Sequence, residues 1–90
     1  MLSRESTGKP YRNANDSFEW DDRKARRNIA DHGVSFELAR FAFDDPRAFE
    51  KLDLDENDEE RCLLTGLADG RMLTVCHTER SHRIRIISAW

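Results

Sequence analysis

The stretch RCLLTGLADGRMLTVCHTERSHRIRIISAW, residues 61–90, decides the fold. It contains three strand-length runs of β-branched and apolar residues, at 61–67, 72–78 and 83–90. Asp69-Gly70 is typical of a tight hairpin between the first two runs, and residues 79–82 form a polar four-residue loop before the third. These features predict an antiparallel three-stranded meander.

Alternation within these runs predicts a sheet with two different faces. In the last run, Ile84 and Ile86 point to the side opposite Arg83 and Arg85. One face of an antiparallel sheet commonly packs on a core while the other meets water. We therefore expect helices on one face and arginines and hydroxyl groups on the other, with the imidazole of His77 as a further candidate for the uncovered face.

Upstream of the meander, the sequence predicts a short strand followed by a capped helix. Phe18 and Trp20 alternate with polar neighbours, as a half-buried strand requires. Asp21 is a typical N-cap for a helix over residues 22–32, and Gly33 is a typical left-handed C-cap.

A second helix is expected after Ser35, another N-cap, over the largely apolar residues 36–43. Asp44-Asp45-Pro46 should end it, because the residue before a proline is pushed out of the helical region. Residues 48–52 are compatible with a short strand, and residues 53–60 are expected to form a mobile acidic loop. The fold class is therefore α+β.

Composition limits the chain to one small domain. It has 90 residues, of which 38% are hydrophobic and 37% are charged, so only one modest core can form and a multidomain enzyme is excluded. Residues 1–16 lack apolar periodicity and are expected to be a disordered tail, which leaves residues 17–90 as the domain. Neither a signal peptide nor a membrane span is expected, which favours the cytoplasm.

The negative charge of the chain is concentrated in one segment. The net charge is −3, made up of +1 over residues 1–43, −7 over residues 44–60 and +3 over residues 61–90. The basic C-terminal third therefore leaves a phosphate-binding face possible. Cys62 and Cys76 form no zinc-like spacing with the histidines and are expected to be small buried residues, so no metal or cofactor is predicted.

Spaced elements along the chain resemble the BrnT family of toxins. The resemblance covers nearly all of residues 18–89, and its HGVSF, FDDP and IISA elements are specific when taken together. The matching residues are Phe18-x-Trp20-Asp21-x-x-Lys24-x-x-x-Asn28-x-x-x-His32-Gly33-Val34-Ser35-Phe36, Phe43-Asp44-Asp45-Pro46, Glu60-Arg61, Arg71-x-Leu73-x-Val75 and Arg83-x-x-Ile86-Ile87-Ser88-Ala89.

This resemblance implies a compact α+β fold like that of the RelE ribonucleases and a metal-free activity that cleaves RNA and stops translation. It also implies neutralisation by a BrnA-type antitoxin, through which operator DNA would be bound. In the family the last strand usually continues into a helical segment rich in Arg and Glu. Here Trp90 takes the place of an arginine, so we expect that segment to be absent.

Metal-free RNA cleavage needs a base for the 2′-hydroxyl proton, cations for the charge on phosphorus and an acid for the leaving oxygen. Arg61, Arg83 and Arg85 are the expected charge stabilisers, because a guanidinium fork matches two phosphate oxygens. Glu60 or His77 is the expected base. Lys24, Arg71 and Arg80 are the expected RNA-binding residues.

Each assignment has a structural alternative. Glu60 and Arg61 could form a cross-strand ion pair at the sheet edge. His77 could be a packed or hydrogen-bonded residue, and Lys24 could be solvated helix surface.

Two functions are accordingly kept from the sequence. The first is an endoribonuclease toxin, and the second is an inactive binding module that only docks an antitoxin. In both cases a basic antitoxin is expected to cover the acidic segment 53–60 and the arginine face, attracted by opposite charge.

Overall fold

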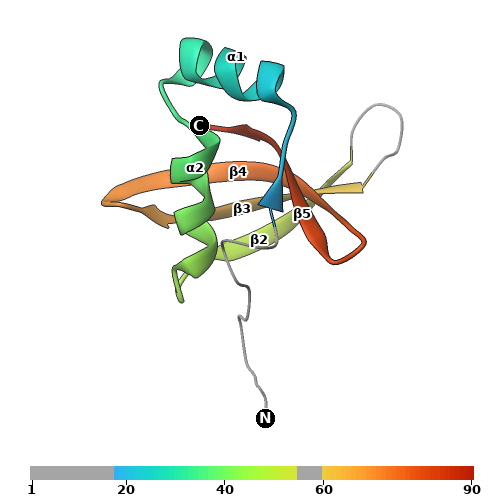
Figure 1. Cartoon of the computed structure of the whole chain (residues 1–90). Helices are drawn as coiled ribbons and strands as arrows, with labels where there is room; N and C mark the ends of the chain where they lie inside the picture. The colour runs from blue at the N-terminus through green and yellow to red at the C-terminus, as the bar shows by residue number, and fades with distance from the viewer. Residues whose placement is uncertain (1–17, 55–59) are drawn as a thin grey trace.

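The computed structural model describes residues 18–54 and 60–90, which form one mixed sheet with helices on one side (Figure 1). The expected tail over residues 1–16 and most of the expected acidic loop lie outside these residues. Within them, no helix is long and apolar enough to span a bilayer. The elements are β1 (Phe18–Glu19), α1 (Asp22–His32), α2 (Phe36–Ala39), the 3-10 helix η1 (Arg40–Asp44), β2 (Phe49–Leu54), β3 (Glu60–Ala68), β4 (Arg71–Arg80) and β5 (Arg83–Ala89).

The α+β prediction is confirmed, and the predicted meander forms the centre of a larger sheet. The strand order is β1-β5-β4-β3-β2. The strand expected over residues 48–52 is β2, which extends to Leu54 and pairs antiparallel with β3. β1 pairs parallel with β5, with Phe18 opposite Ile84 and Glu19 opposite Arg85.

Both hairpins of the meander close with two-residue turns of positive φ. Asp69 and Gly70 have φ values of 51° and 84°, as a type I′ turn requires. The four-residue loop expected over residues 79–82 is wrong, because Arg80 pairs with Arg83. The turn consists of Ser81 and His82 alone, whose φ values of 49° and 69° suit the twist of the flanking strands.

The predicted helix caps are confirmed. The Asp21 carboxylate accepts hydrogen bonds from the backbone amides of Arg23 and Lys24 at 2.8 and 3.1 Å. Gly33 has a φ of 69° and ends α1 in the left-handed conformation. The Ser35 hydroxyl accepts from the amide of Leu38 at 3.0 Å and begins α2.

The second helix is shorter than expected. It is α-helical only over α2 and then tightens into η1 before Asp45, whose amide donates to the Ala42 carbonyl at 3.3 Å. Such tightening is common at the C-terminal end of a helix, and here it precedes Pro46, which cannot continue the helix. The expected break at residues 44–46 is therefore confirmed.

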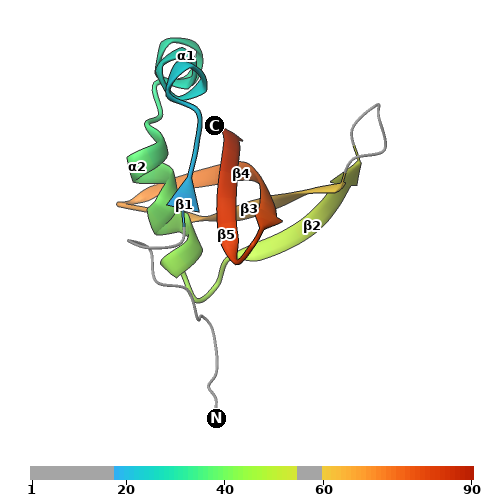
Figure 2. The same ribbon diagram turned by 45° about the vertical axis from the view of Figure 1, so that its right-hand side comes forward.

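α2 and η1 cover one face of the sheet and leave the other open, whereas α1 lies beyond the C-terminal end of β5 (Figures 1 and 2). On the covered face, Leu73, Val75, Ile84 and Ile86 are each at most 2% exposed and pack with buried residues of α2 and η1. Two edge-to-face ring contacts extend this core to the N-terminal strand region, between Phe18 and Phe43 and between Trp20 and Phe36. We call the opposite side of the sheet the open face.

β3 approaches η1 closely at Gly66. A Cβ atom at this position would lie 2.8 Å from the carbonyl oxygen of Ala42 and 2.9 Å from the Cβ of Ala48, so only glycine fits without a shift. The Asp45 carboxylate adds a polar connection, because it accepts from the amides of Leu67 and Arg47 at 2.8 and 2.9 Å. The bond from Leu67, followed by that from Arg47, lowers the pKa of Asp45 below its usual value of 3.8.

The carboxamide of Asn28 joins α1 to the end of the sheet. It is 5% exposed, and it donates to the Val34 and Ala89 carbonyls at 2.9 and 2.7 Å while accepting from the Ala89 amide at 3.1 Å. One side chain therefore satisfies backbone groups of β5 and of the segment that leads into α2.

Asn28→Ala should destabilise the protein by about 2 to 4 kcal/mol, because three buried backbone groups lose their partner. Chemical denaturation followed by circular dichroism measures the change. Ile29→Ala is the control, since Ile29 is 50% exposed on the same helix. An Asn28→Ala protein as stable as the control would contradict this role.

Asp45→Asn should show a pH-dependent loss of stability. Because folding lowers the pKa of Asp45, its charge stabilises the folded state above the unfolded pKa, and this contribution disappears as the pH falls through the folded pKa. The stability difference between the two proteins should be greatest near neutral pH and shrink as the pH falls below 3.8. Asp44→Asn, which removes the adjacent charge and leaves the amide contacts of Asp45 in place, is the control.

Candidate functional site

Arginines from three strands lie on the open face near the β4–β5 hairpin. Because Leu73, Val75 and His77 are buried on the covered face, strand alternation turns Thr78 and Arg80 to the open face. Their partners on β5, Arg85 and Arg83, share that face, and so does Arg61 of β3. We call Arg61, Arg80, Arg83 and Arg85 the arginine cluster.

Two of these arginines converge on one carboxylate. The guanidinium of Arg85 lies 3.3 Å from Oε2 of Glu19, and that of Arg83 lies 3.8 Å from Oε1. The side chains of Arg85 and Arg83 are 34% and 54% exposed, so solvent reaches both. A planar anion with two oxygens is already held here by two guanidinium groups, which is the geometry that a phosphate would need.

A third arginine, Arg61, lies in a row of open-face side chains that runs across the strands from β3 through Thr78 of β4 to Arg85 of β5. The β3–β4 register, extended by one residue from the Cys62–His77 pair, places Arg61 across from Thr78. Thr78 lies opposite Arg85. The backbones of Arg61 and Arg85 are therefore about 10 Å apart, two strand spacings. Arg61 binds Asp53 of β2 at 2.9 Å, so each end of the row carries an ion pair.

The structure does not bring the two expected bases to this row. Glu60 is adjacent to Arg61 in β3 and points to the other face. His77 is 4% exposed on the covered face, where its ring packs edge-to-face on Phe43 with centroids 4.9 Å apart. The expected convergence of one base, Glu60 or His77, with the arginines on one surface is therefore not observed, because neighbouring strand residues alternate between faces.

The three expected RNA-binding residues lie in different places. Arg80 pairs with Arg83 and belongs to the arginine cluster. Arg71 begins β4, about 30 Å along the strand from Arg80, and is separate from the cluster. Lys24 lines a hollow between α1 and β5 together with Ser88, so it borders the open face at the opposite end of β5.

Glu19 and Asp53 are the acidic partners that the sequence did not reveal. Glu19 is 66 positions from Arg85, and only the parallel pairing of β1 with β5 brings the two together. The sequence predicts that Asp53 belongs to the acidic loop, but in the structure it lies in β2 and pairs with Arg61 of β3. One sequence signal could have identified Glu19 as a partner. It lies between Phe18 and Trp20, so it is the charged residue at the solvent-facing position of the short strand.

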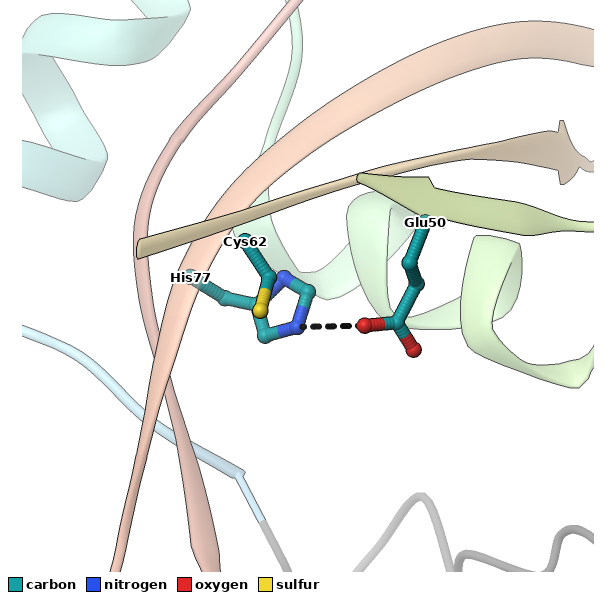
Figure 3. A group of neighbouring side chains, drawn as sticks. All are labelled: Glu50, Cys62 and His77. Carbon is teal, nitrogen blue, oxygen red and sulfur yellow. Dashed lines mark ion pairs between the residues drawn. The ribbon is translucent and has the colours of Figure 1, made fainter. Parts of the chain in front are cut away.

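A second group of side chains with metal-binding or acid–base chemistry lies on the covered face, beside Phe43 of η1. Glu50 of β2, Cys62 of β3 and His77 of β4 place their ligand-type atoms within 4.8 Å of one another (Figure 3). Nε2 of His77 is 3.9 Å from Oε1 of Glu50. Burial raises the pKa of the Cys62 thiol, and the nearby carboxylates of Glu50 and Glu79 raise it further.

The two cysteines differ in environment. Cys76 is 3% exposed, as expected for a small buried residue, and burial raises its pKa. Cys62 is only half-buried and lies directly opposite His77. The spacing of Glu50, Cys62 and His77 in the sequence did not indicate that they lie together. They come from three strands, and the register of the sheet brings them into contact.

Comparison with known protein families matches residues 20–90 to a family described as ribonuclease toxin, BrnT, of type II toxin-antitoxin system. No curated protein matches the chain. The matched segment includes α1, both groups of side chains and the whole C-terminal meander.

Proposed function

Because this chain belongs to the BrnT family of ribonuclease toxins of type II toxin-antitoxin systems, we propose that it is a metal-independent endoribonuclease that cleaves RNA and inhibits translation. The observation that carries the proposal is the convergence of Arg83 and Arg85 on the carboxylate of Glu19. This part of the open face is solvent-accessible and can accept a phosphodiester in place of the carboxylate.

Arginines suit the reaction because the attacking 2′-oxygen places additional negative charge on the phosphate. Arg83 and Arg85 would bind two phosphate oxygens, and Arg61 would approach from β3 on the other side of Thr78. Guanidinium groups held by a sheet need little rearrangement as this charge develops, which is the main requirement for electrostatic catalysis. Arg80 would bind a neighbouring phosphate.

Glu19 is better placed than Glu60 or His77 to take the 2′-hydroxyl proton. Its carboxylate contacts both Arg83 and Arg85, whereas Glu60 and His77 face the other side of the sheet. A general base must lie within hydrogen-bond reach of the proton that it removes. Once RNA occupies the guanidinium groups, Glu19 would lie beside the sugar of the bound nucleotide.

The open face also suits the proposed BrnA-type antitoxin. Phe49 and Trp90 are 63% and 47% exposed and line a shallow hollow on this face together with Leu63. Exposed apolar side chains grouped beside charged residues are typical of a protein-binding surface. An antitoxin bound here would cover the arginines and neutralise the toxin in the cytoplasm, and operator DNA would be bound only through the antitoxin.

A second function, an inactive module that docks an antitoxin, is favoured by the separation of the expected bases from the arginines. Purified protein distinguishes the two. Antitoxin binding with RNA left intact at high protein concentration supports the binding module, whereas cleavage that depends on the arginine cluster supports the enzyme.

Replacing Arg83 and Arg85 together by alanine should lower RNA cleavage by at least about 100-fold, because the phosphate loses its main charge stabilisers. Expression of the unaltered protein alone should arrest bacterial growth and shorten bulk mRNA, and the double variant should do neither. Arg26→Ala, which removes an exposed arginine from α1, is the matched control. Full cleavage by the double variant would reject the proposed site.

The Glu19→Gln variant tests whether the Glu19 carboxylate acts as the base or serves only as an ion-pair partner of the arginines. Loss of the competing charge should strengthen binding of a 2′-O-methyl oligonucleotide, which cannot be cleaved, by several-fold at low salt. Cleavage of unmodified RNA should nevertheless slow at least about tenfold, because the proposed base is gone. If both binding and cleavage increase, Glu19 is not the base.

A further inference from the structure

We propose that Glu50, Cys62 and His77 form a binding site for a Zn²⁺-type transition-metal ion on the covered face of the sheet. The site is separate from the arginine cluster and is independent of the proposed RNA cleavage. It would have one carboxylate, one thiolate and one imidazole ligand, all of which are ordinary ligands of Zn²⁺.

The geometry needs only a small contraction to bind the ion. The three ligand atoms already lie within 4.8 Å of one another. In a tetrahedral zinc site with metal–ligand distances near 2.0 to 2.3 Å, ligand atoms are about 3.3 to 3.6 Å apart. Figure 3 shows the carboxylate of Glu50 directed at the imidazole. Because the Glu50 side chain is 41% exposed, it can close the remaining distance by rotation.

The imidazole is held in an orientation that suits a metal ligand. Nδ1 of His77 lies 3.3 Å from the carbonyl oxygen of Val75, and in the tautomer with hydrogen on Nδ1 it donates to that oxygen. This tautomer places the lone pair on Nε2, the atom nearest Glu50. Metal-binding histidines characteristically donate their other ring nitrogen to a carbonyl or carboxylate in this way. Packing against Phe43 further restricts the ring.

The electrostatic surroundings favour a cation. The thiol of Cys62 experiences the negative charges of Glu50, Glu79 and Glu60, which lie on three adjacent strands. A divalent ion would offset this repulsion. On binding, the Cys62 thiol releases its proton to solvent and the thiolate coordinates the metal, so one proton leaves for each ion bound. Three protein ligands leave the fourth tetrahedral position to water.

Metal binding would connect the outer strand β2 to β3 and β4. Glu50 comes from the edge of the sheet, whereas Cys62 and His77 are direct partners inside it. The expected consequence is a higher unfolding temperature in the presence of Zn²⁺, because the ion binds the folded arrangement and not the separated strands.

Co²⁺ titration of the chelator-treated full chain tests the site, since Co²⁺ bound to a thiolate has a charge-transfer absorption band. We expect one Co²⁺ per chain, displacement by Zn²⁺, and a rise in unfolding temperature with Zn²⁺ alone. Cys62→Ser should abolish the band, and Glu50→Gln, at an exposed position, should weaken metal affinity at least about tenfold. Cys76→Ala and His82→Asn are controls that should keep the band.

The absence of a thiolate band in the unaltered protein would overturn the proposal. A band that survives in Cys62→Ser and disappears in Cys76→Ala would overturn it equally. Thermal unfolding without metal establishes that each variant is folded before titration. Since no readout involves RNA, failure of this site and failure of the proposed cleavage are distinguishable.

Discussion

Burial of one face of the sheet is the constraint on which the rest of the structure depends. The apolar residues of β3, β4 and β5 must meet α2 and η1, and the strand period of two then sends their neighbours to the open face. A slip of one residue in any strand would exchange the two faces, so the core determines where the arginines lie. Arg61, Arg83 and Arg85 reach solvent because Leu64, Ile84 and Ile86 are buried.

Polar contacts at a few positions hold the helices in place over this core. Asn28 attaches α1 to the last residues of β5, and Asp45 attaches the end of η1 to β3. Gly66 permits the close approach that the Asp45 contact requires. These residues lie outside the arginine cluster, yet they determine which surface of the sheet remains open and therefore which charged groups are available.

The same alternation separates two kinds of chemistry. Guanidinium groups with carboxylate partners lie on the open face, where a flexible polyanion can reach them. Imidazole, thiol and carboxylate groups meet on the covered face, at the margin of the helices, where a small cation fits better than a nucleotide. Neighbours in β3 illustrate the division, because Arg61 belongs to the first group and Cys62 to the second.

Local patterns in the sequence were sufficient for the type and order of most elements, although α2, β2 and the β4–β5 turn have other boundaries than expected. The caps at Asp21, Gly33 and Ser35, the break at Pro46 and the strands of the meander all follow from backbone preferences that act over a few residues. The arginines were identifiable for the same reason, since their charge and spacing are local properties.

Only the tertiary structure determined which side chains these functional residues contact. The parallel pairing of β1 with β5 brings Glu19 to Arg83 and Arg85, and the register of three strands brings Glu50 and Cys62 to His77. Each contact joins residues that are distant in sequence, and it depends on which strands pair, in which direction and in which register. Those choices minimise the free energy of the whole core, so no local stretch of sequence contains them.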